Sequence, residues 1–306
     1  MGLCWRNDVL HCQPAGALLA LLRAPLSRRL LAHEQRKLIR CSSQTAVAAS
    51  GVAGLEEFIQ AAGTGTDSFD GADEELGRKE ALVKSTQNNM LSALAIAKAT
   101  QAGTEADAAA AAQLWKEAKT LFFGSAALQS MSPSATSDKR CKNYDTCGGG
   151  DPSGDTGTAS NTNIAIYDAF AAGEADPTTY ADNAAIISAQ NTIVYMQATL
   201  RYLNKMDKDN QAGAGASSKN QGEGWAFYKV IAPYLAGADA DGANTINTAY
   251  DRDVVNTVNT NYCTGLPIIL KNLPSDTTLG DLGTLNEDYS GNGVDYTAGG
   301  CVGPST

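Results

Sequence analysis

Histidine is almost missing from this chain of 306 residues. Its two histidines, His11 and His33, both lie in a basic N-terminal leader, residues 1–41. A protein that has lost this leader has no imidazole at all. That excludes a Ser-His-Asp triad, a Cys-His pair, a histidine general base and a His-ligated zinc site.

Long apolar runs and nucleotide motifs are missing too. The apolar stretch 15–22 is much shorter than the roughly twenty residues that cross a bilayer, which predicts no transmembrane segment. There is no GxSxG, and no Lys-Ser/Thr follows the glycines near 148 and 291, which argues against a phosphate cradle. The stretch from Asp207 begins like a calcium loop, but Ala212 and Ser218 stand where that loop needs glycine and glutamate.

Charge separates the leader from the rest. The leader holds seven of the 23 basic residues and two of the 33 acidic ones, so the remainder carries 16 basic and 31 acidic residues. Such an acidic body repels nucleic acid, and we expect no nucleic-acid partner. The leader itself is typical of a targeting peptide. We favour a secretory signal over an organelle transit peptide or a mispredicted start.

Cysteine usage supports the secretory reading. Three of the seven cysteines belong to the leader, which leaves an even number in the body: Cys141, Cys147, Cys263 and Cys301. An even count in an acidic, loop-rich body fits two disulfides formed in an oxidising compartment. Of three pairings we favour Cys141–Cys147 with Cys263–Cys301. Four reduced thiols in an organelle are the alternative.

Hydrophobic periodicity predicts helices, and no alternating strand pattern of useful length is present. We therefore expect an all-α helical bundle, with Gly124 and Gly173 ending helices and Pro233 kinking or ending another near Ala232. The expected helices span residues 73–98, 106–124, 161–172, 177–206, 223–235 and 243–262.

Between these helices we expect Gly/Asp/Asn-rich connections within one helical domain, 42–306. Flexible loops are predicted near 145–160 and 207–220, and an irregular tail over 274–306. A repeated sequence pattern also suggests two degenerate helical repeats, with chance similarity as the alternative. The pattern matches Asn161-Thr162 and Tyr167-Asp168 with Asn244-Thr245 and Tyr250-Asp251.

Without histidine, oxygen atoms are the available metal ligands. Carboxylate and phenolate groups suit hard cations such as ferric iron. For Glu223 a helix N-cap is the commoner explanation, for Tyr167 and Asp168 a surface helix turn, and for Asp138 a salt-bridged helix end. The candidate ligands on or beside helices are Glu117, Asp138, Tyr167, Asp168, Glu223 and Tyr228.

Four strings in this order carry a family resemblance, over roughly residues 55–265. They are Leu121-Phe122-Phe123-Gly124, Ser137-Asp138-Lys139-Arg140-Cys141-Lys142-Asn143-Tyr144, Gln197-Ala198-Thr199-Leu200-Arg201-Tyr202, and Glu223-Gly224-Trp225-Ala226-Phe227-Tyr228-Lys229. Together with Ile231-Ala232-Pro233 they resemble the Fe-assimilating, low-iron-inducible periplasmic protein family of algae, some members of which are high-CO2-inducible extracellular proteins. The resemblance implies secretion, induction by iron limitation and iron assimilation without known catalysis. It supplies no ligand set.

The combined hypothesis is a non-enzymatic protein that binds or concentrates iron, ferric or ferrous, at the cell surface. It would pass iron to a plasma-membrane iron transporter or ferroxidase. Glu223 with Tyr228 lead the expected ligands, and Arg201 holds an anion or pairs with a carboxylate. Two alternatives remain: a structural extracellular protein, induced by iron limitation or high CO2, that does not bind iron, and an enzyme in a chloroplast or other organelle.

Overall fold

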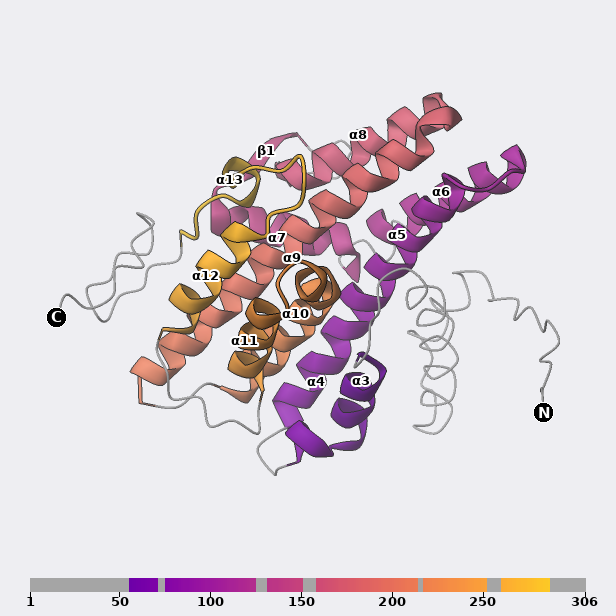
Figure 1. Ribbon diagram of the computed structural model, residues 1–306. Coiled ribbons are helices and arrows are strands. Elements are labelled where there is room, and N and C mark those ends of the chain that lie inside the picture. The colour runs from indigo at the N-terminus through magenta and orange to yellow at the C-terminus, as the bar shows by residue number, and fades with distance from the viewer. Residues whose placement is uncertain are drawn as a thin grey trace, which may run out of the picture.

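The computed structural model describes residues 55–70, 75–124, 131–150, 158–213, 217–251 and 260–286. Over these ranges the protein is an all-α bundle with one small hairpin, which confirms the expected fold class (Figure 1). The predictions for the leader 1–41, for Cys301 and for the tail beyond 286 lie outside the described residues.

The first part of the chain forms an extended helical arm. After α3 (Leu55–Thr64) and the short turn η1 (Asp67–Phe69), α4 (Glu75–Lys84), the π-helical segment η3 (Ser85–Met90) and α5 (Leu91–Ala102) follow without a break. This matches the long helix expected over 73–98. Next comes α6 (Ala108–Phe123), where Asp107 accepts a hydrogen bond from Ala110 N–H as N-cap and Gly124 ends the helix as predicted.

The rest of the bundle is built around α9 (Tyr180–Gln211), the long helix through the middle of the molecule (Figure 1). Helix α8 (Asn161–Ala175) lies along its first half, and the turn η5 (Pro177–Thr179) joins the two. Helices α10 (Ser218–Ala238) and α12 (Asn261–Lys271) lie along α9 as well, and α11 (Ala240–Tyr250) packs between α10 and α12.

Helix α9 takes part in two separate hydrophobic clusters. The smaller cluster lies among α5, α6, α8 and the start of α9, where Ala184 and Ile187 are buried. The larger cluster joins α3, α4, α10, α11 and α12 to the second half of α9, from Ile193 to Met206. Burial of apolar surface along both halves of one continuous helix fixes the two groups of helices to each other.

The π segment η3 is stabilised by its own polar side chains. An i→i+5 register leaves carbonyls without their usual partners. Asn88 Nδ2 donates to the Lys84 carbonyl at 3.0 Å, while its Oδ1 accepts from Thr136 and Tyr195 hydroxyls at 2.7 and 3.0 Å. Asn89 Nδ2 donates to the Ala226 carbonyl at 2.8 Å. The segment therefore connects the arm to α7 (Pro133–Tyr144), α9 and α10.

Helix α7 (Pro133–Tyr144) was not predicted, because we expected the chain to be irregular there. Its N-terminus has Ser132 as N-cap and Pro133 at the first position. Its buried face carries hydroxyl groups instead of an apolar stripe: Ser137 hydrogen-bonds both Ser160 and Thr162. Hydrophobic periodicity is therefore absent from a helix that is nevertheless packed.

The segment expected as a flexible loop near 145–160 contains a hairpin in its described parts. Strands β1 (Cys147–Gly150) and β2 (Thr158–Ser160) pair antiparallel, with Cys147 opposite Ser160. The predicted Cys141–Cys147 disulfide is present and joins α7 to β1. Cys263 is also disulfide-bonded, and its expected partner Cys301 lies outside the described residues.

Several helix boundaries differ from those expected. Gly173 lies inside α8 instead of ending it, and α10 continues through Pro233 to Ala238. The single helix expected over 243–262 is replaced by α11 and α12, with residues 252–259 outside the described part. In the tail, the described residues include the short helix α13 (Leu279–Leu282), and Leu282 and Leu285 are buried in the larger cluster.

The linker expected over 207–220 is helical over most of its described length, since α9 ends at Gln211 and α10 begins at Ser218. Asp207 explains the extension. It is buried, and its carboxylate accepts hydrogen bonds from the N–H groups of Asn261 and Tyr262 and from the Asn261 side chain. Asp207 therefore provides the hydrogen-bond acceptors for the free N–H groups at the start of α12, because the N-cap residue Thr260 provides no side-chain hydrogen bond.

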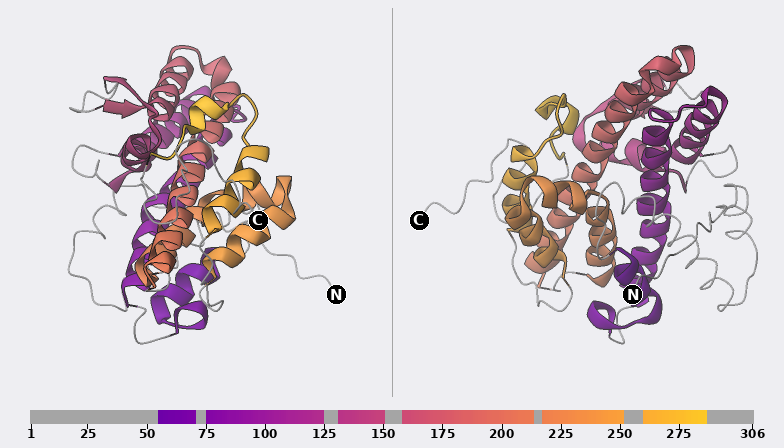
Figure 2. Two further views of the ribbon diagram at one scale, coloured as in Figure 1. Left: turned by 90° about the vertical axis from the view of Figure 1, so that its left-hand side faces the viewer. Right: turned by 45° about the vertical axis from the view of Figure 1, so that its right-hand side comes forward.

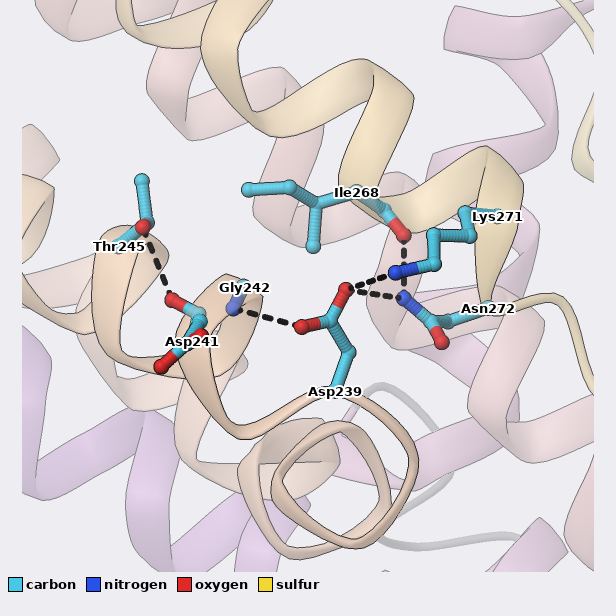
Figure 3. A network of polar contacts seen from close by, with 7 residues as sticks. All are labelled: Asp239, Asp241, Gly242, Thr245, Ile268, Lys271 and Asn272. Atoms are coloured by element: carbon cyan, nitrogen blue, oxygen red, sulfur yellow. Dashed lines mark hydrogen bonds and ion pairs between the residues drawn. The ribbon is translucent and has the colours of Figure 1, made fainter.

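A polar clamp fixes the corner between α10, α11 and α12 (Figure 3). Asp239 Oδ1 accepts from Gly242 N–H at 2.9 Å and caps α11. Its Oδ2 accepts from Lys271 Nζ at 3.0 Å and Asn272 Nδ2 at 3.4 Å, at the end of α12. One carboxylate therefore holds the beginning of one helix against the end of another.

Candidate functional site

Glu223 lies at a helix junction and not at a helix start. The N-cap of α10 is Ser217, whose hydroxyl accepts from Asn220 N–H, so the N-cap explanation for Glu223 is wrong. Glu223 stands in the second turn, with its side chain 12% exposed and 3.5 Å from Lys84 Nζ on α4. Its carboxylate is also hydrogen-bonded to the Tyr202 phenol on α9.

Two glycines explain why α4 comes so close to Glu223. Helices α4 and α10 lie side by side (Figures 1 and 2). Gly77 on α4 and Gly222 on α10 are both buried. A Cβ atom on Gly222 would overlap the Gly77 carbonyl. The two helix backbones can approach this closely because Gly222 has no side chain.

Four cations lie at this junction, and Lys84 pairs with the Glu223 carboxylate at 3.5 Å. Lys84 belongs to α4, Lys139 and Arg140 are consecutive on α7, and Arg201 belongs to α9. Burial lowers the pKa of Lys139, and repulsion by Lys84 and Arg140 lowers it further, whereas Glu223 raises it. We refer to Lys84, Lys139, Arg140 and Arg201 as the cationic cluster.

Arg140 is the most deeply placed member of the cationic cluster. The residue is 7% exposed, and its Nε and Nη1 atoms are buried without a hydrogen-bond partner. Burial lowers its pKa and repulsion by Arg201 adds to this, whereas attraction from Glu223 opposes it. A guanidinium remains charged under these conditions, so the fold holds a buried positive charge with unused donors.

Tyr202 completes this junction. Burial raises the pKa of its phenol, and the neighbouring Glu223 charge and hydrogen bond raise it further. Arg201 and Lys205 lie 5.5 and 5.1 Å from the centre of its ring. The phenol is therefore neutral near pH 7 and donates a hydrogen bond to the Glu223 carboxylate.

The other leading candidate, Tyr228, faces away from Glu223. It is buried, and its hydroxyl donates to the Ala243 carbonyl on α11, while Glu223 faces α4 and α9. Burial raises the pKa of the Tyr228 phenol. The structure does not bring together the pair that the sequence placed on one helical face.

Three further candidates lie near α6 and α8 and are also dispersed. Glu117 pairs with Lys98 at 2.6 Å and accepts from Gln113; these bonds outweigh its partial burial and lower its pKa. The Tyr167 ring lies 4.9 Å from Lys119 Nζ, and Asp168 is exposed.

The Asp138 carboxylate is used in hydrogen bonds that stabilise the local structure. Its carboxylate accepts from Ser160 N–H and from Asn163 Nδ2, both at 2.8 Å. It thereby connects α7 to the hairpin and to the start of α8. Among the described residues, no group of three or more His, Cys, Asp or Glu side chains could hold a metal ion.

Sequence reasoning missed the importance of Lys84, Lys139, Arg140 and Tyr202. A signal was present, since Lys139 and Arg140 lie in the second of the four strings that carry the resemblance, and Arg201 and Tyr202 end the third. Each basic residue taken alone looks like an ordinary solvated charge. Only the packing of α7 against α9, and of α9 and α4 against α10, brings them to the junction that holds Glu223.

Comparisons of the chain with protein-family models, with curated proteins and with solved structures found no match. Within the described part of the chain, no helix is both long enough and apolar enough to cross a membrane.

Proposed function

We propose that the protein is a non-catalytic iron-assimilation protein of the periplasm or cell surface. It binds or concentrates iron there and passes it to a plasma-membrane iron transporter or ferroxidase. The observation that carries the proposal is the convergence of three of the four strings at one junction. Lys139 and Arg140, Arg201 and Tyr202, and Glu223 meet there, although they are far apart in the sequence.

The chemistry of the junction supports this role in one respect. Glu223 and Tyr202 place a carboxylate and a phenol within hydrogen-bond contact, and both are oxygen donors of the kind that ferric iron prefers. The Cys141–Cys147 disulfide is typical of proteins from an oxidising compartment, which supports secretion over an organelle.

A second candidate function is a structural or interaction protein of the same compartment that does not bind iron. It is favoured by the cationic cluster, because four positive charges oppose the approach of a bare metal cation to Glu223. The separate partners of Tyr228, Glu117 and Asp138, on different helices, favour it as well.

Metal loading separates the two candidates. The purified full-length protein is mixed with ferric or ferrous iron and desalted, and the retained iron is measured per protein molecule. We expect near-integer iron in the wild type and loss of at least tenfold affinity in Glu223→Gln, because an amide does not supply the negative charge. Glu117→Gln is the matched control, since it removes a carboxylate outside the junction, and should retain the iron.

A tyrosinate charge-transfer band in the visible spectrum identifies the phenolic ligand. The band should disappear in Tyr202→Phe and persist in Tyr228→Phe. If neither oxidation state of iron is retained, the capture proposal is wrong and the second candidate stands.

A further inference from the structure

We propose that the cationic cluster is a binding site for a small oxyanion of the phosphate or carboxylate type. The site consists of Lys84 from α4, Lys139 and Arg140 from α7, and Arg201 from α9, beside Glu223. This inference does not rest on the proposed role in iron assimilation.

The unsatisfied guanidinium of Arg140 is the first observation. Its Nε and Nη1 donors are buried without a partner in a residue 7% exposed. Unpaired donors of a charged group in a protein interior destabilise the fold, and a bound ion that completes their hydrogen bonds is one explanation for such a group. Oxygen atoms of an anion would accept hydrogen bonds from these donors.

The balance of charge at the junction is the second observation. Lys84 pairs with the Glu223 carboxylate at 3.5 Å, and Lys139 and Arg140 stand close enough to the other cations of the cluster to be repelled by them. The whole chain carries a formal charge of −10, so this is a local reversal of the protein's charge. Mutual repulsion of Lys84, Lys139, Arg140 and Arg201 is relieved by a bound anion.

The cluster also has a route to solvent. Lys139 is exposed and Lys84 is partly exposed, while Arg140, next to Lys139 on α7, is buried. An anion can therefore meet the lysines first and the deeper arginine afterwards. The fork-like guanidinium donors favour oxyanions over a spherical halide, because several oxygens of one ligand can accept together.

Binding to the full-length, chelator-treated protein tests the site without iron. Isothermal titration and thermal unfolding are carried out with inorganic phosphate, citrate and, at equal ionic strength, chloride. We expect saturable binding of phosphate or citrate with a rise in melting temperature, and no saturable effect of chloride. Tighter phosphate binding assigns a phosphate ligand, and tighter citrate binding assigns a carboxylate ligand.

Arg140→Met is the decisive variant. It should weaken oxyanion binding at least tenfold and raise the melting temperature of the ligand-free protein, because a buried unpaired charge is removed. Lys116→Met, which removes one exposed cation from α6, should leave both properties unchanged. A purely structural arginine would instead give a lower melting temperature and no change in anion binding.

If circular dichroism shows that Arg140→Met does not fold, a second variant tests the proposal. Arg140→Lys retains the charge but loses the planar donors, and should weaken binding in a folded protein, as should Arg201→Gln. The proposal is overturned if neither phosphate nor citrate binds the wild type saturably, or if binding is unchanged in every folded Arg140 and Arg201 variant. Iron retention by the same preparations reports separately on the proposed function.

Discussion

Asp207 shows how a single residue can reverse the interpretation of a segment. In the sequence it begins a polar, alanine- and glycine-containing stretch that resembles a linker. In the fold it is a buried acceptor for the start of α12. Burial raises its pKa to about 6, although hydrogen bonds from Tyr262 and Asn261 oppose the rise.

This pKa predicts a specific pH dependence of stability. The folded carboxyl binds its proton more tightly than the unfolded one, whose pKa is about 3.9. Its contribution to stability is therefore fully present below about pH 4 and is lost as pH rises through about 6. The unfolding free energy of wild type minus that of Asp207→Asn should fall by on the order of 2 kcal/mol between pH 4 and pH 7.

Urea denaturation at several pH values measures this difference, and Asp239→Asn provides a control of opposite sign. Hydrogen bonds from Gly242 N–H, Lys271 and Asn272 lower the pKa of Asp239 (Figure 3). Its contribution is present above the unfolded pKa and is lost on acidification. A pH-independent difference for Asp207→Asn would show that Asp207 has no raised pKa.

At the scale of elements, a glycine inside α8 sets the distance to α6. Gly173 faces the Trp115 ring, and a Cβ atom there would overlap Trp115 and approach the Tyr180 ring. Trp115 is fixed by its indole N–H, which donates to the Phe170 carbonyl at 3.0 Å, and by stacking on Tyr180. The tryptophan has little freedom to move away.

We therefore predict that Gly173→Ala destabilises the protein by about 1–3 kcal/mol, although alanine is the better helix former. Gly237→Ala is the matched control. Gly237 is exposed within α10, and a methyl group added there would have nothing within 4 Å, so alanine should stabilise by about 0.5–1 kcal/mol. Thermal unfolding of both variants tests this prediction. If Gly173→Ala stabilised the protein as much as Gly237→Ala, α6 and α8 would not be in close contact.

The elements that could be predicted are those with an apolar stripe. Helices α4–α5, α6, α8 and α9 carry such stripes, and their existence was predicted from spacing alone. Helix α7 was missed because its buried face uses serine and threonine hydroxyls, which pair with Ser160, Thr162 and Asn88. The end of α9 was missed because its stabilising contact, from Asp207 to α12, is more than fifty residues away in sequence.

The candidate site was predicted only in part for a similar reason. Glu223 was selected as a chemically notable carboxylate, but its neighbours come from three other helices. Tyr228 was selected because it stands five residues after Glu223 on the same helix. At that spacing its side chain points in another direction, and its hydroxyl contacts α11. Arg140 could not be distinguished from a solvated charge until α7 and its burial were known.

At the scale of the molecule, α9 makes one folding unit of two hydrophobic clusters. Ile187 is buried in the smaller cluster and Leu203 in the larger one, on the same continuous helix. We expect a single cooperative unfolding transition, because loss of either cluster leaves half of α9 without its packing. Each of Ile187→Ala and Leu203→Ala should lower stability by about 2–5 kcal/mol and shift the whole transition.

The check is denaturation followed by far-UV circular dichroism and by tryptophan fluorescence, with Trp115 in the smaller cluster and Trp225 in the larger. Curves from the two probes should coincide in the wild type and in both variants. Ile186→Ala, at an exposed position beside Ile187, should have little effect. Two separated transitions, with each variant moving only one of them, would instead mean that the clusters unfold independently and that α9 does not transmit stability between them.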